Sequence, residues 1–336
     1  MAGEPGLQIL QDGLACRSAL TDLASPRHAL RVRRRPVTAR SLHLTTTLLQ
    51  ALLGGIASGA VYGLIALGLS LQFGVMKIIN FAHGAFLMMS MYVCFALTSH
   101  FGLHPLAAMP LTAAALFVVG YACQRWLIDG IYRKESSREP IGVLIFTTGL
   151  WIFLDNAFLA LAGPDSRTID APWANEVWMP GDLIFTYPQI AGLFFACLIT
   201  AALVLFLRHT RTGRAIRATG QDREAASVLG IDSARVYRLS FAIGLLVLGA
   251  AGALLLPLYP VNPFVGDIFG LRAFVIVVLG GIGSVAGAFW GGILVGVLES
   301  VGSQLIPITY AEALIFLLFL ATMYFRPSGL FGVENE

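Results

Sequence analysis

The feature that most constrains the fold is a series of long apolar stretches separated by a few charged segments. Leu44 to Val75 is long and apolar, and Leu271 to Leu305 stays apolar for 35 residues. Only 12% of the residues are charged and 57% are hydrophobic, whereas a soluble domain carries about 25% charged residues. Most of the chain is therefore expected to lie in a nonpolar environment. We predict an all-α, polytopic membrane protein with about eight transmembrane helices, of which one or two are broken or re-entrant.

Basic residues gather in three segments and set the expected orientation. Of the 22 Lys and Arg residues, seven lie in the first 40 residues, four in 125–138 and seven in Arg208–Arg238. Short loops rich in Arg and Lys stay on the cytoplasmic side, so the sequence places all three there. The polar segment Gly163 to Tyr187, which carries two tryptophans, is expected on the external side.

This orientation leaves the number of crossings open. Three apolar segments precede Arg125, whereas two cytoplasmic ends require an even number of crossings. Either 78–99 only dips into the membrane, or 44–75 crosses twice, or the N-terminus is outside.

Residues 1–42 differ from the rest of the chain. They contain seven arginines, no apolar run and no acidic residue after Asp22. The composition predicts a basic, disordered N-terminal extension. A start codon placed too far upstream and an organelle transit peptide are the alternatives.

A short segment within Arg208–Arg238 carries helix start and stop signals. Asp222 can cap a helix N-terminus, Glu224 sits in the first turn, and Gly230 suits the left-handed residue that ends a helix. A helix of about eight residues is unstable alone in water. It must dock on its own protein or on a soluble partner through a small apolar face: Ala225, Val228 and Leu229.

Polar residues interrupt the first apolar region near its end. Exposure of Lys77, Asn80 and His83 to lipid would cost free energy, so these side chains should face protein or water. A helix break here is tolerated only against protein or an aqueous cavity. Two interpretations stay open: a short loop in which Asn80 caps the following helix, or a segment beside a translocation path.

A second break is expected inside the 35-residue apolar stretch, which exceeds one straight crossing of about 20 residues. Gly280-Gly281-Ile282-Gly283-Ser284 divides it, so we expect a short half-helix or re-entrant segment and then a span to about Leu305. Glycine-rich broken helices in transporters often line the path, and helix packing is the alternative. Packing is also the expected role of one stripe of small residues: Gly55, Gly59 and Gly63.

Ionisable residues within the apolar spans are few. Asp155 lies near the outer end of its span and is expected to be partly exposed, while Pro263 and Asp267 suggest an external hairpin. The buried set is too sparse and scattered to indicate a proton relay: His83, Asp155, Glu299 and Glu312.

Catalytic motifs are missing from the sequence. A phosphate-binding GxxxxGK[ST] loop needs a lysine after glycine, but Lys77 follows Met76 and Lys134 follows Arg133. The chain therefore cannot be an ATPase itself. It also lacks HExxH, GxSxG with partners and an acidic cluster, so we expect no catalytic residue, no metal site and no enzymatic activity.

Three stretches resemble the permeases of branched-chain amino acid ABC transporters. The first is GLIALGLSLQFGVMKIINFAHGAFLMM, in which Asn80-Phe81-Ala82-His83-Gly84 is most recognisable. The second is LRAFVIVVLGGIGSVAGAFWGGILVGVLE and the third is the closing FRPSGLFG. In addition, Glu-Ala-Ala, three residues, then Gly resembles the coupling-helix loop of ABC-transporter permeases in general, where this short helix sits in a cleft of the ATPase subunit. The resemblance covers about 44–332, although members usually have an acidic residue where this chain has Ala85.

The resemblance implies the permease subunit of an ATP-driven importer in a bacterial plasma (inner) membrane. The permease domain would be 43–332, with 208–238 as its cytoplasmic coupling loop. Branched-chain amino acids, or related small amino acids and amides, would be the substrates, with urea as an alternative. An ion-coupled secondary transporter of small solutes is the alternative mechanism, and a polytopic membrane enzyme is the third.

The resemblance also implies partners and roles. The chain would bind no cofactor and no nucleic acid, and ATP would bind two partner ABC ATPase subunits. A second, similar permease, an extracytoplasmic substrate-binding protein and membrane lipid complete the expected partners. The expected ATPase contact consists of Glu224, Ala225, Ala226 and Gly230. Candidate residues for the translocation path are Asn80, His83, Gly280, Gly281, Gly283 and Ser284.

Overall fold

The computed structural model describes residues 37–134, 141–169, 173, 176–181, 183–326 and 328–331 of the 336 residues. The chain divides into two compact units, Met1–Leu44 and Thr45–Glu336. The predicted N-terminal extension falls in the first unit, and most of it lies outside the described residues, so its disorder stays a prediction. All contacts given below belong to the second unit.

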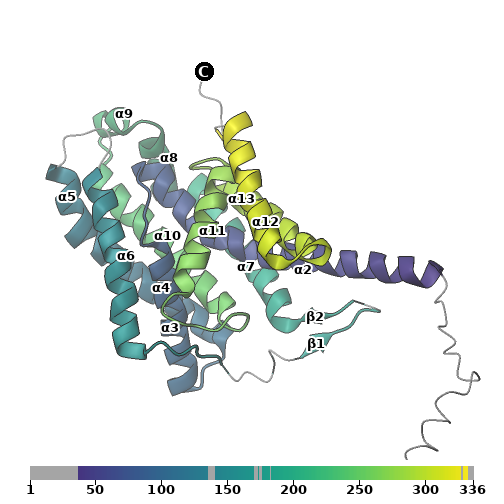
Figure 1. Ribbon diagram of the computed structural model, residues 1–336. Helices are drawn as coiled ribbons and strands as arrows, with labels where there is room; N and C mark the ends of the chain where they lie inside the picture. Colours follow the sequence, from purple (N-terminus) through teal and green to yellow (C-terminus); the bar gives the residue numbers. More distant parts are fainter. Residues whose placement is uncertain are drawn as a thin grey trace, which may run out of the picture. The chain divides into compact units, whose positions relative to one another are not determined.

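Most of the described residues are helical, which confirms the all-α prediction (Figure 1). A short antiparallel pair of strands, β1 (Val177–Trp178) and β2 (Phe185–Thr186), precedes α7. The helices in chain order are α2 (Val37–Met76), α3 (His83–Phe101), α4 (Pro105–Cys123), the π-helix η1 (Gln124–Ile128), α5 (Asp129–Lys134), α6 (Ile141–Ala162), α7 (Tyr187–His209), α8 (Arg211–Gln221), α9 (Arg223–Val228), α10 (Ser233–Leu255), α11 (Val265–Gly280), α12 (Val285–Leu305) and α13 (Ile308–Phe325).

Seven helices of the described chain are long and apolar enough to cross a membrane, which confirms a polytopic membrane protein. They are the Thr46–Met76 part of α2, α3, the continuous Pro105–Ile131, α6, α7, α10 and α12. A shorter apolar stretch, Tyr310–Phe325, lies in α13. The predicted count of about eight is therefore close but not confirmed as a number.

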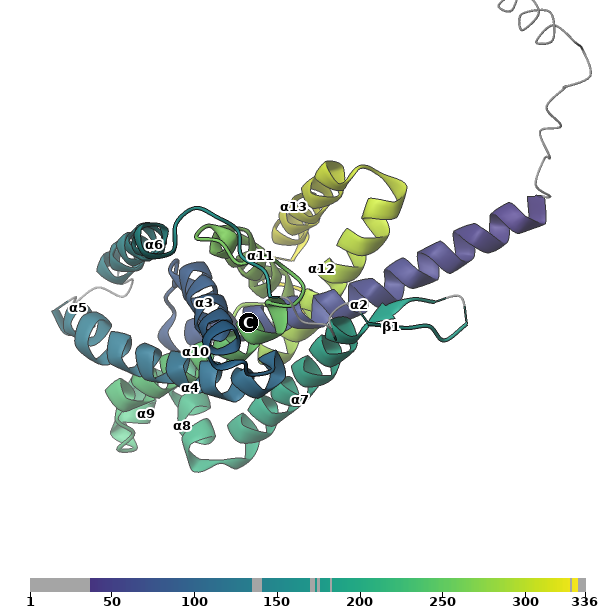
Figure 2. The same ribbon diagram turned by 90° about the horizontal axis from the view of Figure 1, so that it is seen from below.

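A seam of glycines joins α2 to α12. An added Cβ atom at Gly59 would lie 2.7 Å from the carbonyl oxygen of Gly292, and one at Gly55 would lie 2.8 Å from that of Gly296. Gly63 continues the seam one turn further along α2. Backbones that approach this closely exclude any side chain, so the packing role predicted for the stripe is confirmed. Figures 1 and 2 both show α12 lying along α2.

The first predicted helix break follows α2. Residues 77–80 are non-helical, and Lys77 has a left-handed φ of 56°. The chain then runs back beside α2, because His83 Nε2 at the start of α3 lies 3.0 Å from the carbonyl oxygen of Ile65. Ile65 precedes the end of α2 by three helical turns, or about 16 Å at 1.5 Å per residue. Helix α3 thus begins alongside α2, about 16 Å before the end of that helix.

The second predicted break separates α11 from α12. Helix α11 has 16 residues and α12 has 21, and Gly281 and Gly283 between them have φ values of 94° and 82°. Only glycine adopts such values without strain, which explains why the apolar stretch bends here. The expected half-helix is confirmed, although α11 begins at Val265 rather than Leu271. The hairpin predicted from Pro263 and Asp267 is only partly right, because Pro263 lies in the turn between α10 and α11 but Asp267 lies in the first turn of α11.

Contacts at the two ends of α2 settle its direction. Near its start, the Gln50 side chain exchanges hydrogen bonds with the backbone of Ile184, close to β2. Near its end, Gly74 packs against Gly220 of α8. Helix α2 therefore crosses once, from the side of the 176–187 segment to that of 208–238, which agrees with the third of the three alternatives that the sequence left open. The second alternative, in which 44–75 crosses twice, disagrees because α2 is one continuous helix.

Two of the basic segments meet at one end of the molecule. Arg238 at the start of α10 lies 3.6 Å from Asp129, where η1 gives way to α5. We call the end that carries α5, α8 and α9 the basic end (Figure 1). The shared location agrees with the prediction that 125–138 and 208–238 lie on one side of the membrane.

Candidate functional site

Helix α9 is shorter than predicted but has the predicted start and stop. It spans six residues rather than about eight. The Asp222 side chain accepts hydrogen bonds from the backbone N–H groups of Glu224 and Ala225, at 2.8 and 3.0 Å. Gly230 has a φ of 80°, as expected for a residue that ends a helix. Asp222 and Gly230 thus act as the sequence indicated.

One face of α9 holds the helix to its own protein. Ala226 is buried, its carbonyl oxygen accepts from Ile231 N–H at 3.1 Å, and the Arg223 guanidinium lies 5.5 Å from the centre of the Tyr237 ring. Of the expected ATPase contacts, Ala226 is therefore covered by this chain, while Glu224 is exposed.

The other face of α9 is uncovered. Val228 is 86% exposed and Leu229 is 79% exposed, and Ala225 is exposed too. The apolar face predicted to dock therefore does not dock on the described part of its own protein. Soluble surfaces show single apolar residues commonly, but two adjacent, almost fully exposed large side chains on so short a helix leave a place for a partner.

Helix α8 was not predicted from the sequence. It has 11 residues, and Thr210 caps it by accepting from Gly213 N–H at 2.9 Å. Buried positions recur every three residues, and so do exposed arginines: Gly213, Ile216 and Thr219, and Arg211, Arg214 and Arg217. This periodicity is the signal that could have revealed it, but glycine and threonine at buried positions hide the apolar face.

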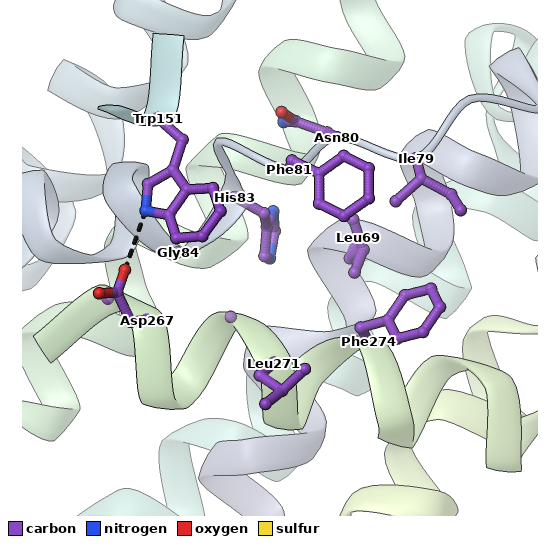
Figure 3. A pocket seen from close by; sticks show the side chains of 12 residues that line it. Leu69, Ile79, Asn80, Phe81, His83, Gly84, Trp151, Asp267, Leu271 and Phe274 are labelled. Atoms are coloured by element: carbon purple, nitrogen blue, oxygen red, sulfur yellow. Dashed lines mark hydrogen bonds between the residues drawn. The ribbon is translucent and has the colours of Figure 1, made fainter. Parts of the chain in front are cut away.

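A cavity of about 290 Å³ lies where the first turns of α3 and α11 meet (Figure 3). Two of the six candidate path residues, Asn80 and His83, line it. The other four do not: Gly280, Gly281, Gly283 and Ser284 lie at the far end of α11, where Gly283 packs against Gly74. The cavity lining consists of Leu69, Ile79, Asn80, Phe81, His83, Gly84, Trp151, Gly266, Asp267, Gly270, Leu271 and Phe274.

Asn80 fixes the shape of the loop that enters this cavity. Its Oδ1 accepts from the N–H of Ala82 at 3.1 Å, and its Nδ2 donates to Gln72 Oε1 at 3.1 Å. Asn80 therefore shapes the short loop but does not cap α3, whose N-cap residue is Ala82. Its place beside a translocation path stays a prediction. Because both side-chain atoms are engaged, Asn80 holds the loop to α2.

His83 has one ring nitrogen engaged and one open. Its side chain is buried, and Nε2 lies 3.0 Å from the Ile65 carbonyl oxygen. A carbonyl oxygen only accepts, so Nε2 carries the proton. Nδ1 has no hydrogen-bond partner in the described chain. Figure 3 shows the imidazole pointing into the cavity between Trp151 and Leu69.

Trp151 and Asp267, which the sequence analysis did not assign to a site, form the polar wall of the cavity. Trp151 Nε1 of α6 donates to Asp267 Oδ1 of α11 at 2.8 Å. Asp155, one turn after Trp151, interacts with the Asp267 carboxyl group. Asp155 is only 6% exposed, and its Oδ1 has no partner among the described residues. The expected partial exposure of Asp155 is therefore wrong.

A second polar cluster centres on Arg272 of α11, which the sequence analysis also missed. Arg272 Nη2 lies 2.9 Å from both Glu299 Oε1 and Glu312 Oε1, and Nη1 donates to Tyr62 Oη at 3.1 Å. Glu299 and Glu312 are therefore not scattered, as the sequence suggested, but share one cation. Within the described residues, no group of three His, Cys, Asp or Glu side chains is placed to hold a metal ion.

Comparison with known proteins identifies the family. The family model for the permease component of branched-chain amino acid transport systems matches residues 51–323. The chain belongs to this permease family. It is therefore a multi-pass plasma-membrane transport component, as the sequence predicted. No solved structure matches it.

Named relatives of this permease fall into two transport classes. The chain is 34% identical to the high-affinity branched-chain amino acid permease BraD of Pseudomonas aeruginosa and to LivH of Escherichia coli K12, over 84% of its length and 95% of theirs. A more distant relative is the fructose import permease FrcC of Rhizobium meliloti, 27% identical over 65% of this chain and 61% of that protein.

Proposed function

We propose that this permease is the membrane-spanning subunit of an ATP-driven importer and that α9 is its contact with the ATPase subunits. The observation that carries the proposal is the exposure of Val228, the last residue of the six-residue α9, and of Leu229 directly after it, while the other face of α9 is anchored. A partner that covers these side chains gains about 1.5–3 kcal/mol for each. With Glu224, Ala225 and Gly230, they form the proposed ATPase contact, and Ala226 anchors it.

The proposed substrates are branched-chain amino acids or related small amino acids and amides. This part of the proposal draws on relatives such as BraD and LivH, which are branched-chain amino acid permeases. The transport system would include two ATPase subunits that bind ATP, a second and similar permease, and an extracytoplasmic binding protein. This chain would supply no cofactor site.

Packed helices offer a route from α9 to the cavity. Asp232 caps α10 directly after the α9 turn, and α10 packs against α3. Gly252 of α10 touches Ser90 of α3 so closely that a Cβ atom there would overlap the serine side chain. Movement of α9 by a closing ATPase dimer would therefore displace α10 and α3, and with α3 the loop that lines the cavity. The basic end is cytoplasmic in this scheme.

The test is ATP hydrolysis by the reconstituted complex in lipid vesicles. The vesicles contain this chain, the candidate ATPase subunits, the second permease and the binding protein, with leucine, isoleucine, valine, amides or urea. We expect stimulation by a branched-chain amino acid. Val228→Asp should abolish the stimulation, and Gly230→Leu should uncouple ATP hydrolysis from uptake because leucine is strained at a φ of 80°.

The matched control is Val177→Asp, since Val177 is also exposed but lies in β1, at the opposite end of α7. It should keep normal stimulation and uptake. Normal uptake with Val228→Asp would refute the assignment of α9. Uptake that needs no ATPase and follows a proton or sodium gradient would instead establish an ion-coupled secondary transporter, and stimulation by urea alone would change only the substrate.

A further inference from the structure

We propose that the cavity between α3, α6 and α11 binds the α-ammonium group of the translocated amino acid, with Asp267 as its direct partner. The proposal rests on the proposed importer function and adds the chemical group by which the membrane subunit itself selects its substrate. Three independent features support it: the charge of the cavity, the state of His83, and the chemistry of the remaining walls.

The first feature is negative charge without a cation. Asp155 and Asp267 interact with each other, and neither takes part in the ion pairs found in the described chain, which join Arg238 to Asp129 and Arg272 to Glu299 and Glu312. The side-chain hydrogen bonds of Asp267 join it to Trp151 and Asp155, and neither of these residues is a cation. Placing a carboxylate within a membrane costs free energy unless a positively charged group pairs with it.

The second feature is the open ring nitrogen of His83. Since Nε2 donates to Ile65, Nδ1 of the neutral imidazole is an acceptor, and it is an unpaired atom on a 98% buried side chain that lines the cavity. Asn80 is engaged on both of its side-chain atoms. The open polar atoms around the cavity are thus acceptors, and an ammonium group, with three donors and a positive charge, complements them.

The third feature is that the rest of the cavity lining is apolar, in contrast to the polar wall that contains Asp267. These side chains surround the space below and beside His83 (Figure 3): Leu69, Ile79, Phe81, Leu271 and Phe274. A volume of about 290 Å³ lies just below the usual range of about 300–1,000 Å³ for ligand pockets, as suits a small ligand. A small aliphatic side chain fits such walls, whereas urea and fructose offer neither a cation nor an apolar body.

The first experiment measures leucine transported per ATP hydrolysed by the reconstituted complex carrying Asp267→Asn. Asparagine keeps the shape and can still accept the Trp151 hydrogen bond, but it removes the charge. We expect binding-protein-stimulated ATP hydrolysis to continue and leucine transported per ATP to fall about tenfold, as for loss of one charged hydrogen bond. The matched control is Asp165→Asn, an exposed carboxylate just beyond α6, which should change neither quantity.

The second experiment uses the unmodified complex without binding protein, so it does not depend on the stability of a variant. Saturation-transfer NMR compares leucine with 2-hydroxy-4-methylpentanoate, which differs by a hydroxyl group in place of the ammonium. We expect transfer to leucine and at least tenfold less to the hydroxy acid. Equal transfer to both, or an unchanged ratio of leucine to ATP with Asp267→Asn, would overturn the proposal. Absence of ATP-dependent uptake in the unmodified complex would refute the importer function instead.

Discussion

The Arg272 cluster gives a prediction whose size follows from burial. The exposed fractions of the side chains are 14% for Arg272 and 16% for Glu299, but 50% for Glu312. Arg272→Met leaves the nearly buried Glu299 carboxylate without a cation, and breaking a buried ion pair in this way costs about 3–5 kcal/mol. Because 16% exposure leaves Glu299 some water, we expect about 3 kcal/mol. Glu312→Gln should cost less than about 1 kcal/mol, as for an exposed pair.

The assay is a double-mutant cycle on the free energy of unfolding. The protein is unfolded with SDS in mixed micelles, and the loss of helix is followed by far-ultraviolet circular dichroism. Glu299→Gln removes the charge that Arg272→Met leaves behind, so the double variant should regain about 2 kcal/mol relative to the sum of the two single effects. A coupling energy below about 0.5 kcal/mol would show that the two changes are independent, and would refute the assignment of a buried pair.

Three further predictions concern the glycine seam, the helix caps and Ser284, a candidate path residue that does not line the cavity. Gly59→Leu should lower the free energy of unfolding by about 1–3 kcal/mol or prevent folding, because its Cβ atom would meet the backbone of α12. Gly149→Leu should be tolerated, because there is open space around Gly149. Unfolding in SDS measures both effects. Asp222→Ala should reduce stimulated ATP hydrolysis severalfold because a six-residue helix depends on its cap, and Asp232→Ala, at the start of the 23-residue α10, should reduce it less. Ser284→Ala should cost about 0.5–2 kcal/mol through loss of the α12 cap, yet leave the leucine concentration for half-maximal uptake unchanged, because Ser284 does not line the cavity.

Local signals predicted the helices and their breaks well. The bilayer thickness limits a straight span to about 20 residues, so a 35-residue apolar stretch with Gly281 and Gly283 inside it had to break there. In the same way, Asp222 and Gly230 marked the ends of α9, because caps act on backbone groups two or three residues away. These features depend only on neighbours in the sequence.

The cavity could be predicted only in part, because it depends on contacts between distant segments. Asn80 and His83 were identified from the sequence because they are polar residues in an apolar region. Trp151 and Asp267 are 116 residues apart, and the sequence around one does not indicate contact with the other. Arg272 was missed for the same reason: its neighbours in sequence are apolar, and its two carboxylates come from α12 and α13. The sequence likewise could not show that Gly281 and Gly283 form a turn away from the cavity, because this location depends on how α11 packs.

The ion cluster also bears on the order in which this protein is made. A ribosome releases Arg272 before its carboxylates, and Glu312 follows 40 residues later. An arginine at the centre of a bilayer costs about 2.5–3.5 kcal/mol on insertion, and α11 with 16 residues is short for a span on its own. Helix α11 therefore has no favourable place in lipid until α12 and α13 have been synthesised. Helices α11, α12 and α13 must therefore leave the insertion machinery as one unit rather than one after another.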